Sequence, residues 1–316
     1  MQTRPLGQSG LDIVPLVFGG NVFGWTVDEA TSFALLDALV DAGINAIDTA
    51  DVYSVWVDGH TGGESETIIG KWLAANPAKR DKVLILTKVG APMRPDDKGL
   101  KAGRIERCVE ASLRRLQTDR IDLYQAHYPD AGTPQDETLE AFNRLVTAGK
   151  VRAIGASNFN PAQLAEALDI STAGGLARYE ALQPEYNLYD RSGFEGELRD
   201  LCIARGLGVI PYFSLASGFL SGKYRSEADL SQSQRGSGVG KYLNPRGFAI
   251  LAALDNVAAA HDASPAEVAL AWMIASPGVT APIASATSLG QLAGLVRSLD
   301  LVLTPEEMTA LDAAGA

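Results

Sequence analysis

Four residues with acid–base side chains lie where apolar runs give way to polar sequence. Asp48, Lys88 and His127 each end such a run, and Tyr53 lies in the loop just after the first. If these runs are neighbouring parallel strands, their carboxyl ends meet on one face of a barrel, where barrel enzymes build their active sites. A carboxylate, an ammonium, an imidazole and a phenol gathered there predict a site for proton transfer.

These side chains also suit one another chemically. A free phenol has a pKa of about 10, which is too high for easy proton exchange at neutral pH. We expect the Lys88 ammonium to lower the pKa of Tyr53, with Asp48 as its counter-ion. His127 would orient a substrate oxygen and share its proton. Each residue alone has an ordinary structural role, such as a helix cap or a strand end, so the prediction depends on the set.

The elements that would position these residues repeat along the chain. Apolar runs without strict alternation indicate strands covered on both faces, and segments with helix signals separate them. Such alternation predicts a closed barrel or a doubly wound sheet. A length of 316 residues without a composition break favours one (β/α)8 TIM barrel domain over residues 1–316. The expected strands are Leu16–Phe18, Ile44–Asp48, Val83–Lys88, Ile121–His127, Val151–Ser157, Tyr179–Gln183, Val209–Tyr212 and Thr280–Ile283.

Cap signals predict where several helices begin. Thr26 with Glu29 suggests a capping box, and Gly43 should end that helix. Cap–proline pairs occur at Thr133-Pro134, Asn160-Pro161, Ser264-Pro265 and Thr304-Pro305, the last of which opens a terminal helix over 305–315. Two segments lie outside the repeat. Residues 3–14 predict an N-terminal β-hairpin that caps the barrel bottom, and 213–245 predict a long Gly/Ser-rich loop after strand 7.

Composition and motifs exclude several other classes of protein. The net charge of −11 argues against nucleic acid and anionic lipid as partners. We see no signal peptide and no apolar run of roughly 18 residues, and Cys108 and Cys202 lack CxxC spacing, so we expect a cytoplasmic protein. Three histidines without an HExxH motif predict no catalytic metal. The glycines match neither the Rossmann fingerprint nor a P-loop.

Several strings occur together in one order: DTADVY, GGESETIIGKWL, LTK, DLYQAHYPD, IGASNF, LQPEYNL and PYFSLASGFLSGKY. With them the chain resembles the aldo-keto reductases over nearly its whole length. The resemblance implies a (β/α)8 barrel that binds a nicotinamide dinucleotide without a Rossmann fold. It also implies reversible reduction of aldehydes and ketones, with Tyr53 as general acid supported by Asp48, Lys88 and His127.

The resemblance implies a set of cofactor-binding residues as well. Ser157, Asn158 and Gln183 would bind the carboxamide, and Tyr212 would stack on the nicotinamide ring. The stretch Ser214–Lys223 would lie along the pyrophosphate. The residues named for the pyrophosphate and the adenosine end are Ser214, Leu215, Gly218, Gly222, Lys223, Ser285, Thr287 and Gln291.

Two departures from the family pattern bear on specificity. Ser54 stands where many relatives have glycine, and a longer loop follows it. No Lys or Arg occurs from 281 to 296, where many NADP-using relatives bind the adenosine phosphate. We still expect NADP(H) to be preferred, with NAD(H) possible, because hydroxyls and free helix amides near Ser288 can bind a phosphate. Basic residues that could close over it are Lys223, Arg225, Arg235, Lys241 and Arg246.

Aromatic residues predict the substrate wall: Phe23, Trp25, Trp56 and Tyr128. They would suit a small-molecule aldehyde or ketone with an aromatic, alicyclic or sugar-like body. Two alternatives stay open. One is a nicotinamide-binding regulatory or sensor subunit of a channel, a form that usually carries an N-terminal extension, whereas this chain starts almost at the hairpin. The other is a barrel lyase or isomerase that uses Lys88 as a Schiff base. The substrate, the direction of reaction and the oligomeric state stay open.

Overall fold

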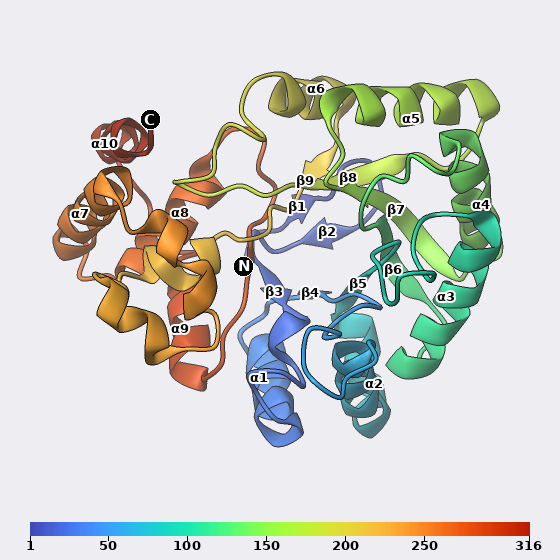
Figure 1. Ribbon diagram of the computed structural model, residues 1–316, viewed down its shortest axis with the longest axis horizontal. Helices are drawn as coiled ribbons and strands as arrows, with labels where there is room; N and C mark the ends of the chain where they lie inside the picture. The colour runs from blue at the N-terminus through green and yellow to red at the C-terminus, as the bar shows by residue number, and fades with distance from the viewer.

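Eight parallel strands curl into a barrel with helices around it in the computed structural model, which describes residues 1–316 (Figure 1). The strands follow the order β10-β3-β4-β5-β6-β7-β8-β9. Backbone hydrogen bonds from Thr280 and Ala281 to Val209, and from Ile283 to Pro211, join the two outer strands. The predicted (β/α)8 fold is confirmed.

The strands lie close to their predicted positions. Their bounds are β3 (Val17–Gly19), β4 (Ala46–Asp48), β5 (Leu84–Val89), β6 (Ile121–Ala126), β7 (Val151–Ser157), β8 (Tyr179–Gln183), β9 (Gly208–Val209) and β10 (Ile283–Ala284). The seventh and eighth strands differ most from the prediction. Proline has no N–H to donate to a ladder, so Pro211 and Pro282 interrupt the regular pairing there.

The helices cover the outside of the barrel. Their bounds are α1 (Glu29–Asp41), α2 (Glu64–Ala75), α3 (Ala102–Leu116), α4 (Gln135–Thr147), α5 (Pro161–Gly174), α6 (Glu197–Arg205), α7 (Pro245–Ala260), α8 (Pro265–Ala275), α9 (Leu289–Arg297) and α10 (Pro305–Gly315), with a 3₁₀ segment η2 (Pro77–Lys82) before β5. Asn160, Ser264 and Thr304 cap their helices before proline as predicted, and each forms a capping box.

Two predicted caps are wrong. Asp28, not Thr26, caps α1, because the chain turns tightly before it and the Thr26 amide bonds to the carbonyl of Val22. Thr133 does not cap α4, since its hydroxyl donates to Asp130 instead.

An N-terminal hairpin closes the barrel bottom as predicted. β1 (Arg4–Pro5) pairs antiparallel with β2 (Asp12–Ile13). Leu6, Leu11 and Ile13 are buried in the same cluster as the inward-facing residues of the strands. The opposite end of the barrel, at the strand carboxyl ends, is therefore the end left for a site.

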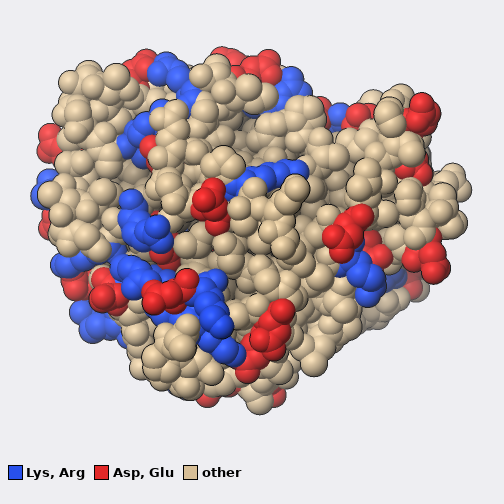
Figure 2. Space-filling view, turned by 180° about the vertical axis from the view of Figure 1, so that it is seen from behind, with Lys and Arg blue, Asp and Glu red and all other residues tan.

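The segment 213–245 is more ordered than the predicted loop. It contains four 3₁₀ segments, η3 (Ala216–Ser221), η4 (Glu227–Gln232), η5 (Gly236–Gly238) and η6 (Gly240–Tyr242), and leads into α7 beside α8 and α10 (Figure 1). None of the helices is both long and apolar enough to cross a membrane. On the face shown in Figure 2, basic and acidic side chains are interspersed.

Candidate active site

The four predicted acid–base residues meet at the carboxyl ends of β4, β5 and β6. The Lys88 ammonium is fully buried and donates to Asp48 Oδ2 at 2.7 Å, to the Thr49 carbonyl at 2.7 Å and to the Tyr53 hydroxyl at 3.0 Å. The His127 ring lies edge-on to Tyr53, with 6.0 Å between ring centroids. Parallel pairing thus makes neighbours of strand ends that lie far apart in the sequence.

Burial sets the direction of the pKa shift at Tyr53 and His127, whereas the charged partner sets it at Lys88. Burial raises the pKa of Tyr53 above its ordinary value, and the charge of Lys88 only opposes that rise. The expected lowering of the Tyr53 pKa is therefore wrong. Burial lowers the pKa of Lys88, but Asp48 and Tyr53 outweigh it and leave that pKa above its ordinary value. Burial and then the charge of Lys88 hold the pKa of His127 well below its ordinary value. At neutral pH the site holds a neutral phenol, an ammonium and a neutral imidazole.

Polar side chains beside this cluster form a connected network. The Tyr212 hydroxyl donates to Asn158 Oδ1 at 2.7 Å, and Asn158 Nδ2 donates to the His127 carbonyl at 2.9 Å. Ser157 Oγ donates to the Gln183 carbonyl, and Gln183 Nε2 donates to Asp48 Oδ1 at 2.9 Å. Amide and hydroxyl groups of this kind can bind a primary carboxamide from both sides.

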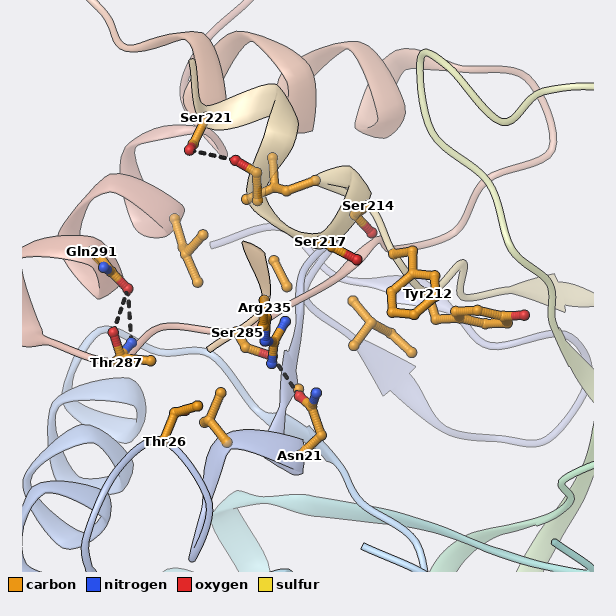
Figure 3. A pocket seen from close by; sticks show the side chains of 18 of the residues that line it. Asn21, Thr26, Tyr212, Ser214, Ser217, Ser221, Arg235, Ser285, Thr287 and Gln291 are labelled. Carbon is orange, nitrogen blue, oxygen red and sulfur yellow. Dashed lines mark hydrogen bonds between the residues drawn. The ribbon is translucent and has the colours of Figure 1, made fainter. Parts of the chain in front are cut away.

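A cavity of about 1030 Å³ runs from these residues toward α9. Figure 3 shows Tyr212 and Ser214 at one end, Ser285 beside Asn21, and Thr287 with Gln291 at the other end. The predicted residues that line it are Asp48, Tyr53, His127, Ser157, Asn158, Gln183, Tyr212, Ser214, Leu215, Gly218, Lys223, Ser285, Thr287 and Gln291. Lys88 lies behind Tyr53, and Gly222 is outside the lining, at the end of η3.

Aromatic rings surround the mouth of the cavity near Tyr53. Trp25, Trp56 and Tyr128 line it, with Trp56 packed edge-on against both Trp25 and Tyr53. Phe23 does not belong to this wall, because it is fully buried and stacks on Phe18 in the core.

Phe213 is a member of the wall that the sequence prediction missed. Its side chain is 45% exposed and lines the cavity. Its position directly after Tyr212, in the motif PYFSLASGFLSGKY, was the available signal.

Only some of the basic residues proposed for the phosphate face the cavity. Lys223 and Arg235 line it, and the Arg235 guanidinium lies 5.2 Å from the centroid of the Trp25 ring. Three others are held elsewhere and correct that expectation: Arg225 pairs with Asp255, Lys241 lies near Glu185 and Asp190, and Arg246 donates to backbone carbonyls. Arg297 and Glu267, an ion pair that also lines the cavity, were missed, since Arg297 lies just past the segment considered.

Comparisons with known proteins agree with this geometry. The model of the aldo/keto reductase family matches residues 15–316. The chain is 36% identical to the uncharacterized oxidoreductase YrpG of Bacillus subtilis (strain 168), over 99% of this chain and 95% of that protein. It is 34% identical to the aldo-keto reductase YhdN of the same organism, over 92% and 84%. It is also 33% identical to a probable voltage-gated potassium channel subunit beta of Oryza sativa subsp. japonica, over 99% and 96%. The chain therefore belongs to the aldo/keto reductase family.

Proposed function

We propose that this protein is an NAD(P)H-dependent oxidoreductase that reversibly reduces small aldehydes or ketones to alcohols. The observation that carries the proposal is the contact of the buried Lys88 ammonium with both Asp48 and the Tyr53 hydroxyl. A buried lysine bound to a carboxylate is a poor Schiff-base nucleophile, because such a nucleophile must lose its proton. The same lysine is well placed to support a phenol that donates a proton.

The residues have separate roles in the proposed reaction. Tyr53 donates its proton to the substrate oxygen as that oxygen gains negative charge, and Lys88 stabilises the phenolate that is left. The neutral His127 ring, which lies edge-on to Tyr53, orients the same oxygen. When bound, a reduced nicotinamide supplies the hydride. Trp25, Trp56 and Tyr128 cover the apolar part of the substrate.

The cofactor-binding assignments are part of the same proposal. Ser157, Asn158 and Gln183 would hold the carboxamide, and Tyr212 would stack on the ring. The segment from Ser214 to Lys223 would bind the pyrophosphate, with Lys223 adding charge. We propose NADP(H) as the preferred cofactor, with Arg235, Thr287 and the N-terminal amides of α9 near the 2′-phosphate. Two buried, unpaired cysteines fit a cytoplasmic location.

A second candidate is a regulatory subunit that binds the dinucleotide without needing turnover. The observation in its favour is the 33% identity to a protein named as a channel subunit. Fold likeness alone does not fix function, so the two candidates need a kinetic test.

The test is the oxidation of NADPH, followed by absorbance, with a panel of aromatic, alicyclic and aliphatic carbonyls. We expect turnover with part of the panel, and we expect Tyr53→Phe to lose nearly all of it while binding NADPH within a few-fold of the wild type. If Tyr53→Phe retained more than about 10% of the activity, the lost barrier stabilisation would be below about 1.4 kcal/mol, and Tyr53 would not be the acid. NADPH binding with no turnover on any carbonyl would favour the regulatory subunit.

A further inference from the structure

Phe213 lines the cavity in a backbone conformation that phenylalanine rarely adopts. Its φ is +54°, in the left-handed region, and its side chain is 45% exposed. Its chain neighbours Tyr212 and Ser214 lie at one end of the cavity (Figure 3). In the left-handed region the Cβ of an L-residue comes too close to the following carbonyl oxygen. Such a conformation persists only where surrounding contacts hold it, and it occurs most often at functional sites.

Contacts with two other segments hold Phe213 in this conformation. Its carbonyl oxygen accepts hydrogen bonds from Asn187 Nδ2 at 3.0 Å and from the Ala216 amide at 2.7 Å. Asn187, which lies just after β8, is fully buried, and its Oδ1 accepts from two backbone amides of its own loop. The Phe213 ring packs edge-on against Tyr212, with 5.1 Å between ring centroids. The protein itself therefore keeps this ring at the cavity.

The strand order places Phe213 across the barrel mouth from the proposed acid. Phe213 lies just after β9, which is separated from β5 by β8, β7 and β6 on one side and by β10, β3 and β4 on the other. β5 carries Lys88, which contacts Tyr53. Two other aromatic residues that are about half exposed line the same cavity, Trp56 after β4 and Tyr128 after β6. The three aromatic side chains thus come from three separate parts of the barrel rim.

We infer that Phe213 is a specificity-determining residue, which favours carbonyl substrates that carry an apolar ring. The inference rests on the proposed function, because it takes the reaction at Tyr53 as given. A half-exposed phenyl ring is removed from water when an apolar ring packs on it, and edge-to-face or offset contacts between aromatic rings add to that gain. A short aliphatic aldehyde offers this ring little apolar surface, so it gains much less from the contact.

The contribution of Phe213 belongs to substrate binding. Its side chain has no group that transfers a proton, and its contact with a substrate ring is the same in the ground state and in the transition state. An interaction of that kind lowers KM and leaves kcat nearly unchanged. Because about half of the side chain is available for burial, its loss should raise KM for ring-bearing carbonyls by about tenfold.

The experiment measures kcat and KM of wild type and Phe213→Gly with benzaldehyde, cyclohexanecarbaldehyde and propanal at saturating NADPH. Glycine adopts the left-handed conformation without a steric cost, so the variant should keep the backbone and fold. We expect kcat/KM for the two ring-bearing aldehydes, relative to propanal, to fall by about tenfold in the variant, and to fall through KM. The Kd of NADPH, measured by fluorescence titration, should stay within about threefold of the wild-type value.

Phe213→Ala and Phe248→Ala form a matched pair of controls. Phe248 of α7 is 42% exposed and lies outside the cavity, so its variant should keep the wild-type preference, whereas Phe213→Ala should repeat the loss seen with glycine. An unchanged preference in Phe213→Gly, or a rise in the Kd of NADPH that matches the rise in KM, would overturn the inference. Turnover of propanal would leave the proposed function standing in that case. Failure of wild type to reduce any of the three aldehydes would overturn both.

Discussion

At the scale of single residues, desolvation outweighs charge in setting the pKa of Tyr53. The sequence places an ammonium beside Tyr53, from which we expected a lowered pKa, but desolvation gives this partly buried phenol a raised one. The consequence favours the proposed role. A phenol that stays protonated at neutral pH is ready to donate, and the Lys88 ammonium 3.0 Å away stabilises the charge left behind.

Replacement of Lys88 tests whether the pair works as one unit. We expect Lys88→Met to reduce kcat about as much as Tyr53→Phe, and the double variant to lose little more, because groups that act together are not additive. NADPH binding should change far less than kcat. Fully additive losses would contradict this and point to an independent role for Lys88, and a thermal melt identifies any variant that fails to fold.

Asp51, three residues after Asp48, is a buried carboxylate that the proposed reaction does not use. Both of its oxygens lack a hydrogen-bond partner, and the hydroxyl of Tyr124 close by lacks one as well. Burial, with the neighbouring charge of Glu66, raises the pKa of Asp51 to about 7. The folded protein therefore holds this proton more tightly than the unfolded chain does.

This linkage predicts how stability depends on pH. A folded-state pKa above the unfolded one gives stability that is complete below pH 4 and is lost as pH rises through about 7. The shift corresponds to roughly 4 kcal/mol as an upper limit. Asp51→Asn should therefore stabilise the protein at pH 8 and flatten the pH dependence of the free energy of unfolding, measured by urea denaturation from pH 5 to 8. A variant less stable than wild type at pH 8 would show that the charged form has a partner.

At the scale of elements, one side chain organises the long loop after Tyr53. Glu64, the first residue of α2, accepts from the backbone amides of Ser54 at 3.0 Å, Thr61 at 2.8 Å and Gly62 at 3.1 Å. The loop between these contacts carries Trp56, which packs against Tyr53. The start of a helix thus fixes the loop that carries one member of the proposed substrate wall, and the departure from the family pattern at Ser54 is accommodated there.

Removal of the Glu64 carboxylate should weaken binding of the substrate more than binding of the cofactor. Glu64→Ala leaves three amides without their partner, each bond contributing about 1 kcal/mol. We expect KM for the carbonyl to rise by about tenfold or more, with the Kd of NADPH within about threefold. Glu64→Gln keeps one acceptor oxygen and should lie between wild type and Glu64→Ala. A rise in the NADPH Kd that matches the rise in KM would mean that the loop supports the whole cavity.

At the scale of the whole molecule, the proposed function requires an acidic protein to bind an anionic cofactor. The net charge is −11, and the cavity cations without a carboxylate partner are Lys223 and Arg235, because Arg297 is paired with Glu267. The segment 213–245 brings both lysine and arginine to the cavity from outside the strand–helix repeat. Under the proposed function, affinity for a 2′-phosphate would therefore depend on few charges in an unfavourable overall field.

The expected result is a modest preference for NADPH that declines with salt. A 2′-phosphate that has no bidentate contact with an arginine gains less binding free energy than a 2′-phosphate that has such a contact. Raising ionic strength from 0.05 to about 0.5 M should reduce the NADPH-to-NADH affinity ratio, because exposed charges are screened. The measurement is the Kd of each cofactor by fluorescence titration. Equal or tighter binding of NADH at low salt would contradict the assignment of NADP(H), and would leave the residues around Tyr53 unaffected.

The sequence alone determined the strand–helix repeat, the hairpin and the strand ends that carry Asp48, Lys88 and His127. These features are local: apolar runs, turn residues and caps act over a few positions, and parallel pairing then brings strand ends together. The caps predicted at Thr26 and Thr133 were wrong because both residues make other hydrogen bonds, to Val22 and to Asp130.

Only the tertiary structure decided the side-chain environments. Phe23 and Trp25 are both aromatic residues of one short segment, yet packing buries one in the core and places the other in the cavity. The same holds for Arg225, which finds a carboxylate partner, and Arg235, which faces the cavity. Burial likewise set the direction of the Tyr53 pKa. Exposure, ion pairing and desolvation depend on residues distant in sequence, so no local pattern contains them.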